Sequence, residues 1–188
     1  LLPGDGWGQG CGNLTTNPSY FATGYFHVLA ARDPANATTW NKLAADAYAL
    51  LSVNSASAPN GLFTDWANAT GAPVAGVSSI QYGYDACRTP WRLATDVAWL
   101  GDAQAKAALT KVANYVASAG GPMKTAYLKN SAFAGAFALS GQVVDQATFD
   151  AWVSQWLTGT GTYETAYFPG TLRMVYLLLA TGNFDSTL

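Results

Sequence analysis

The sequence changes from loop to helix in the stretch Tyr82-Gly83-Tyr84-Asp85-Ala86-Cys87-Arg88-Thr89-Pro90-Trp91-Arg92. A run rich in Ser, Gly, Ala, Pro and Asn precedes it over residues 54–81, which is typical of a long loop. Loops of this length inside a compact domain are usually functional or disordered, and the segment Leu62-Phe63-Thr64-Asp65-Trp66 within it suggests an ordered one. After it, apolar residues recur at helical spacing, so we expect a helix over 85–100.

Helical patterning extends in both directions from this stretch. On the N-terminal side, helices are expected from about Pro18 to Asp33 and from about Thr38 to Leu51. On the C-terminal side, they are expected over about 103–118, 131–140, 146–157 and 171–180. No strand–helix–strand alternation interrupts them. The sequence therefore predicts an all-α fold, and paired helices with long loops fit a toroid of helical hairpins.

The composition limits the kinds of partner. Half of the 188 residues are apolar and 11% are charged, which is enough for one domain with a real core. The net charge is −2 and no basic stripe exists, so neither a nucleic acid nor an acidic membrane surface is expected as a partner. No apolar run reaches the length of a membrane span.

Aromatic residues make up 13% of the chain. They fit either a rich aromatic core or a cleft in which flat rings stack on sugars. The single histidine, His27, and the two cysteines argue against a His-rich or Cys-based metal site. We expect no metal and no organic cofactor.

Asp85 has two interpretations. Because it opens a predicted helix, it could simply be an N-cap that accepts a backbone N–H. Alternatively, Arg88 lies three residues further on and faces the same side. That pair could be a surface ion pair of little consequence. It could also hold an ionised carboxylate ready to take a proton from water.

The string Tyr-Asp-Ala-x-Arg followed by Trp-Arg resembles the catalytic-base motif of glycoside hydrolase family 8. Further segments resemble the family in the same order: Asn-Pro-Ser-Tyr-Phe-Ala at 17–22, Gly-Leu-Phe-Thr-Asp-Trp at 61–66, Asp-Val-Ala-Trp-Leu-Gly-Asp at 96–102, and the closing helix at 171–184. The resemblance covers nearly the whole chain. It implies an (α/α)6 toroid and an inverting, endo-acting hydrolase of β-1,4-linked glucan.

The resemblance also implies roles for single residues. Asp85 takes the position of the general base that activates water, Tyr20 that of a tyrosine beside the water, and Arg88 that of an arginine lining the same site. The residues implied for substrate binding are Tyr84, Tyr167, the more loosely matched Tyr163, and Trp66, for which a buried structural role is equally consistent. An Asp at the base position fits the cellulase and xylanase branch.

An inverting mechanism needs a second carboxyl group, an acid roughly 6.5–9.5 Å from the base. In the family this acid is a Glu on the N-terminal half of the toroid. The single Glu of this chain, Glu164, does not match that position. We therefore expect residues 1–188 to be the C-terminal half of one catalytic domain, with the N-terminal half as its partner and little activity alone.

Several alternatives stay open at this point. Xylan, mixed-linkage glucan and chitosan are all used within the family, and the Asp at the base position argues mildly against chitosan. A carbohydrate-binding or scaffold module without catalysis is a second hypothesis, and a plain helical interaction domain a third. A polymeric glycan is met outside the cytoplasm, so we expect a secreted or periplasmic protein, in which Cys11 and Cys87 could form a disulfide.

Overall fold

The chain folds into seven α-helices over the part described by a computed structural model, which comprises residues 15–74, 81–161 and 164–186. The helices are α1 (Thr23–Arg32), α2 (Ala37–Ser57), α3 (Thr89–Leu100), α4 (Ala103–Ala119), α5 (Ser131–Leu139), α6 (Gln146–Thr160) and α7 (Tyr167–Ala180). Short 3-10 turns join them: η2 (Pro18–Tyr20), η3 (Pro59–Gly61), η4 (Ala86–Arg88), η5 (Pro122–Lys124) and η6 (Ser140–Val143). The predicted all-α class is confirmed.

One small strand pair accompanies the helices. β1 (Thr15–Thr16) and β2 (Ala67–Asn68) are antiparallel, with Thr15 opposite Asn68 and Thr16 opposite Ala67. This pair ties the segment before α1 to the long loop between α2 and α3. The loop is therefore an ordered part of the fold where the structure describes it.

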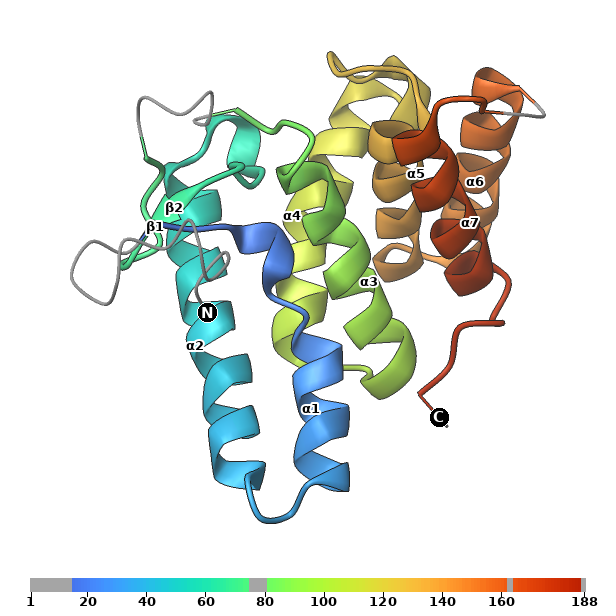
Figure 1. The fold of residues 1–188 in the computed structure, drawn as a ribbon. Coiled ribbons are helices and arrows are strands. Elements are labelled where there is room, and N and C mark those ends of the chain that lie inside the picture. The colour runs from blue at the N-terminus through green and yellow to red at the C-terminus, as the bar shows by residue number, and fades with distance from the viewer. Residues whose placement is uncertain (1–14, 75–80, 162–163, 187–188) are drawn as a thin grey trace.

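Three pairs of consecutive helices, α1–α2, α3–α4 and α5–α6, lie side by side as antiparallel hairpins (Figure 1). α1 packs against α2, α3 against α4, and α5 against α6, while α1 also contacts α3 and α5 also contacts α7. The α1–α2 and α3–α4 connections lie at the lower end of the molecule in Figure 1, and the long loop before α3 lies at the upper end. Long loops thus gather at the end of the hairpins where α3 begins.

The core is centred on α5. All nine of its residues are buried, as expected for a helix that is apolar all round. Gly135 permits its close approach to the neighbouring helices. A Cβ atom at Gly135 would lie 2.7 Å from the ring of Tyr176 and 2.9 Å from the ring of Trp156.

Several predicted helix boundaries needed correction, among them the end of α6, which lies at Thr160 and not at 157. The first predicted helix is divided into η2 and α1, and α2 continues to Ser57, beyond the predicted start of the loop. The helix expected to open at Asp85 begins as η4, and α3 proper starts at Thr89. α7 begins at Tyr167 instead of Thr171, because its Pro169 lies in the first turn, where a proline is tolerated.

Within the described ranges, no helix is both long and apolar enough to cross a membrane.

Candidate active site

Asp85 lies at the end of the long loop, immediately before η4. Its side chain makes no capping hydrogen bond to the turn that follows. Instead, Oδ1 of Asp85 accepts a hydrogen bond from Nη2 of Arg88 and forms an ion pair with it. The N-cap interpretation is therefore wrong, and the structure shows the expected pair. The two side chains are 34% and 20% exposed, so the pair is only partly covered.

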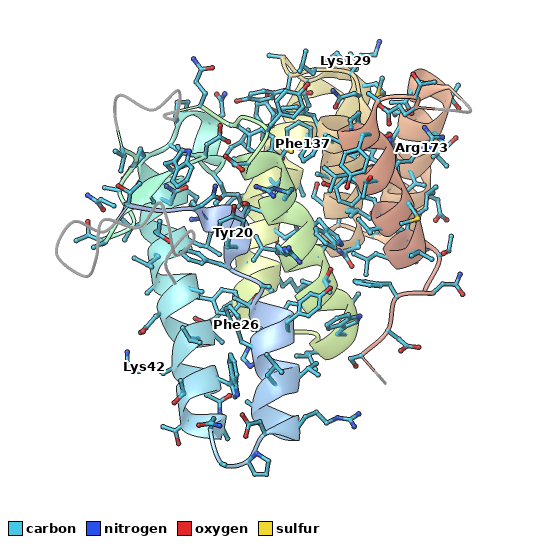
Figure 2. All side chains as sticks on the ribbon, in the orientation of Figure 1. Tyr20, Phe26, Lys42, Lys129, Phe137 and Arg173 are labelled. Atoms are coloured by element: carbon cyan, nitrogen blue, oxygen red, sulfur yellow. The ribbon has the colours of Figure 1, made fainter. Side chains whose placement is uncertain are left out.

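Tyr20 meets this pair from a different part of the chain. It ends η2, a turn fixed by Asn17, whose Oδ1 accepts hydrogen bonds from N of Ser19 at 3.0 Å and from Oγ of Ser19 at 2.6 Å. Cζ of Arg88 lies 5.5 Å from the centroid of the Tyr20 ring, within the range of a cation–π interaction. Figure 2 shows Tyr20 on the turn that precedes α1, and η2 contacts both η4 and α3. Arg88 therefore contacts both Tyr20, through its ring, and Asp85, through the ion pair.

The pairing leaves part of the Asp85 carboxylate available. Among the described residues, Arg88 is the hydrogen-bond donor to Oδ1, and none donates to Oδ2. The planar guanidinium presents N–H donors in a fixed direction, so it fixes the position of Oδ1. A carboxylate oxygen that is free to accept and open to solvent can receive a proton from water.

Tyr84 presents an aromatic surface next to Asp85. It is 49% exposed, although its ring packs edge-on against Phe133 and Phe168, with centroids 5.0 and 5.6 Å away. Its hydroxyl accepts a hydrogen bond of 3.3 Å from Nδ2 of Asn130. A half-exposed ring held in one orientation is suited to stacking against a sugar.

The other residues predicted to bind substrate are Tyr167, Trp66 and Tyr163, which come from two other segments of the chain. Tyr167 is 87% exposed at the first position of α7, directly before Phe168, which contacts Tyr84. Trp66 is partly exposed and follows Asp65 in the long loop. Tyr163 lies outside the described residues. The structure therefore places Tyr167 near Tyr84 through its neighbour and leaves the role of Trp66 a prediction.

A hollow of about 440 Å³ opens beside the loop that carries Asp85. It combines aromatic and aliphatic walls with a few polar side chains, as sugar and other small-molecule sites do. Its lining residues are Gln81, Tyr82, Gly83, Ala126, Tyr127, Leu128, Lys129 and Phe133.

Glu164 has a structural contact at the start of the central helix. Its Oε1 accepts a hydrogen bond of 2.9 Å from N of Ser131, the first residue of α5. Its Oε2 is buried and has no hydrogen-bond partner among the described residues. Glu164 thus contacts the first turn of α5 from the loop that precedes α7.

Cys87 is buried two residues after Asp85. Its thiol donates a weak hydrogen bond of 3.2 Å to the carbonyl oxygen of Tyr84, and burial raises the pKa of the thiol. It is therefore not an activated nucleophile. Cys87 forms no disulfide with any described residue. Cys11 lies outside them, so the proposed bridge stays a prediction.

Asp65 is the residue that the sequence did not single out. It is 8% exposed, and its Oδ1 accepts hydrogen bonds from the backbone N–H groups of Gly83, Asp85 and Ala86. Two features of the sequence could have pointed to Asp65: the Asp-Trp pair of the 61–66 segment and the glycine two residues before Asp85.

The described part of the chain holds no cluster of three or more His, Cys, Asp or Glu side chains arranged to bind a metal.

Sequence comparisons relate the chain to known endoglucanases. The model of the family described as glycosyl hydrolases family 8 matches residues 1–182. Endoglucanase A of Acetivibrio thermocellus is 32% identical over 200 aligned residues, which cover 100% of this chain and 41% of that protein. Endoglucanase 2 of Ruminiclostridium josui is also 32% identical, over 99% of this chain and 41% of its own length.

Solved structures show the same fold at lower sequence identity. A GH8 xylobiose complex from Teredinibacter turnerae matches with a TM-score of 0.72 and 21% identity, over 92% of this chain and 47% of that one. A β-1,3-1,4-glucanase from Paenibacillus sp. X4 matches with a TM-score of 0.70 and 21% identity, over 90% and 50%. The chain thus corresponds to about half of an (α/α)6 fold and spans about two-fifths of the curated relatives. Because the family model covers nearly all of its residues, the chain belongs to family 8 of the glycosyl hydrolases.

Proposed function

We propose that Asp85 is the general base of an inverting endoglucanase that cleaves β-1,4-linked glucan. The observation that carries this proposal is the geometry of three residues. Arg88 holds Oδ1 of Asp85, no described residue donates to Oδ2, and the pair lies against Tyr20. The substrate class is supported by relatives named endoglucanase at 31–32% identity.

In the proposed reaction, the free Oδ2 of Asp85 takes a proton from a water molecule as that water attacks the anomeric carbon. Arg88 holds the other oxygen, Oδ1, in place through its ion pair and hydrogen bond. The Tyr20 hydroxyl, a donor and acceptor, orients the water. The glycosidic oxygen leaves with a proton from an acid on the opposite face of the sugar, which inverts the anomeric configuration.

We propose that the acid is a Glu on the N-terminal half of the same catalytic domain, which would be the partner of this chain. The chain spans about two-fifths of the endoglucanases that it resembles. Its own Glu164 is engaged at the start of α5. Without an acid to protonate the leaving oxygen, this chain alone should hydrolyse glucan very slowly, since general acid–base catalysis contributes about 10²–10⁴-fold.

Substrate binding is assigned to Tyr84 and, with it, Tyr167, Trp66 and Tyr163. The exposed ring of Tyr84 and the hollow beside it would hold sugar units next to Asp85. Xylan and mixed-linkage glucan remain alternative substrates, because solved relatives of the same fold are named for both. A polymer of this size is met outside the cytoplasm, so secretion or export to the periplasm is part of the proposal.

A second candidate function is carbohydrate binding without hydrolysis. It is favoured by the large exposure of Tyr84 and Tyr167 in a chain that corresponds to about half of the fold. Such a module would bind cello-oligosaccharides through the same aromatic side chains. Its binding would be unaffected by Asp85→Asn, and no partner would convert it into a hydrolase.

The test is the hydrolysis of carboxymethyl-cellulose, xylan and mixed-linkage glucan by the complete catalytic domain and its Asp85→Asn variant. We expect Asp85→Asn to lower kcat by about 10²–10⁴-fold, the contribution of a general base. The matched control is Asp46→Asn, which breaks the exposed ion pair with Lys42 in α2 and should leave kcat unchanged. An Asp85→Asn variant with the kcat of the wild type would contradict the proposal.

A further inference from the structure

Asp65 makes an unusual set of contacts for a loop carboxylate. Its Oδ1 accepts hydrogen bonds from the backbone nitrogens of Gly83 at 3.0 Å, Asp85 at 3.1 Å and Ala86 at 2.7 Å. Successive backbone N–H groups that converge on one point form a concave site for an anion. Here that anion is part of the protein, and the loop carrying Asp85 folds around it.

Gly83 shows how closely this loop approaches Asp65. A Cβ atom on Gly83 would lie 2.1 Å from Oδ2 of Asp65 and 2.8 Å from its Cγ. These distances are far shorter than a non-bonded contact, so a side chain at position 83 would displace either the carboxylate or the loop. The close approach of Asp65 therefore explains why position 83, two residues before Asp85, is a glycine.

Asp65 is itself fixed to the helical scaffold. The preceding residue, Thr64, donates its backbone N–H to Oδ1 of Asn54 at 2.9 Å and accepts from Nδ2 of Asn54 at 2.8 Å. Asn54 is fully buried in α2. The N–H of Asp65 also donates to the carbonyl oxygen of Gln81 at 3.3 Å. A continuous set of hydrogen bonds thus leads from α2 through Thr64 and Asp65 to the backbone of Asp85.

We propose that Asp65 is a positioning residue that holds the backbone of Asp85, so that the Asp85 carboxylate faces the attacking water. This inference rests on the proposed function of Asp85 as the base. The direct hydrogen bond to N of Asp85 fixes the point from which the Asp85 side chain projects. Misplacing a catalytic group by about 1 Å can cost on the order of 10²-fold in rate.

The carboxyl group of Asp65 lies close to that of Asp85, and this affects the pKa of Asp65. Burial raises the pKa of Asp65, the N–H of Ala86 opposes this rise, and the negative charge of Asp85 raises the pKa further. Because the three N–H groups converge on Oδ1, protonation at Oδ2 leaves the acceptor in place. An asparagine at position 65 keeps this acceptor oxygen and removes only the charge, whereas an alanine removes both.

The first arm of the test is an NMR titration of the full chain, which does not depend on hydrolysis. We expect the amide protons of Gly83, Asp85 and Ala86 to shift together with the carboxyl carbon of Asp65. In Asp65→Asn this shared titration should disappear. Amide protons that do not follow the Asp65 carboxyl group would overturn the proposed contact.

The second arm measures kcat and KM of the complete catalytic domain. Asp65→Ala should lower kcat by about 10- to 100-fold with little change in KM, because only the base is displaced. Asp65→Asn should recover most of the lost kcat.

The matched control is Asp102→Ala, which removes the N-cap of α4 at the opposite end of α3 from Asp85. Oδ1 of Asp102 accepts from the N–H groups of Gln104 and Ala105, so this variant also removes a carboxylate that binds backbone groups. It should lower stability and leave kcat unchanged. If Asp65→Ala behaves in the same way, Asp65 is only structural and the inference is overturned. If Asp85→Asn keeps full activity, the proposed function fails instead, and the titration still decides whether Asp65 holds this loop.

Discussion

Arg88 contacts both residues that the proposed mechanism requires. It forms an ion pair with Asp85 and places its guanidinium over the ring of Tyr20. Because both partners of the ion pair are partly exposed, the pair should contribute less than about 1 kcal/mol to stability. Its effect on catalysis should be larger, because the guanidinium fixes Oδ1 of Asp85 and with it the orientation of the proposed base.

Arg88→Gln should therefore separate activity from stability. We expect the free energy of unfolding, measured by urea denaturation, to fall by less than about 1 kcal/mol. We expect kcat of the complete domain on carboxymethyl-cellulose to fall by roughly tenfold or more, up to the loss caused by removing the base. Lys42→Gln, which breaks the exposed pair with Asp46, should change neither quantity. Unchanged kcat in Arg88→Gln would argue against a role for Arg88.

Two carboxyl groups should give opposite dependences of stability on pH. Asp96 is fully buried and accepts a hydrogen bond from the Tyr48 hydroxyl, and burial raises the pKa of Asp96. A raised pKa stabilises the fold below the unfolded value of about 3.9, and this contribution is lost as the pH rises through the folded pKa. Asp145 caps α6, and the N–H of Thr148 lowers the pKa of Asp145, so its contribution is lost as the pH falls.

Urea denaturation of Asp96→Asn and Asp145→Asn across the acidic range tests these signs. Relative to the wild type, Asp96→Asn should become more stable as the pH rises from about 3 toward neutrality. Asp145→Asn should become less stable over the same range. If the stability of both variants, relative to the wild type, changed with pH in the same direction, one of the two predicted pKa shifts would have the wrong sign.

The residues of the site were predictable to the extent that their contacts are local. Asp85 and Arg88 are three positions apart on one turn, so spacing alone brought them together. The side-chain hydrogen bonds of Asp65 span 18 to 21 positions across an irregular loop. No periodicity describes the course of such a loop. The sequence therefore identified Asp65 only as part of a family segment and could not show what it binds.

The helices followed from apolar spacing, whereas their ends depended on tertiary contacts. α2 continues to Ser57 although its last turns are rich in Ser and Asn, because Asn54 is buried and bonded to Thr64 and to the carbonyl oxygen of Gly71. Propensity alone would have ended the helix earlier. α7 begins four residues before its predicted start at Thr171, and Pro169 and Gly170 lie within its first turn.

Two helical glycines provide a matched test of the packing around α5. In Gly135→Ala the new methyl group would meet the buried rings of Tyr176 and Trp156, so we expect a loss of about 1–3 kcal/mol in the free energy of unfolding. In Gly159→Ala the methyl group would meet the flexible end of Met123 at 2.5 Å. Because that side chain can move and alanine favours helix, a change within about 1 kcal/mol is expected. Equal losses in the two variants would contradict the close packing of α5.

At the scale of the whole molecule, α6 and α7 lie at one edge of the helical array (Figure 1). A hollow of about 350 Å³ opens there, with a largely apolar lining that includes Phe149, Val153, Leu157 and Leu177. Apolar surface of this kind commonly marks a site of contact with another protein segment. It agrees with the proposal that an N-terminal half completes the toroid and brings the catalytic acid.

The most direct measurement is reducing-sugar release from carboxymethyl-cellulose by the 188-residue chain alone and after addition of the N-terminal half. Intact mass is recorded on each sample. We predict no release above background from the chain alone, and release from the combined halves that Asp85→Asn abolishes. Release by a single species with the mass of this chain would contradict the division of base and acid between two halves, and Glu164→Gln would then be the first variant to make.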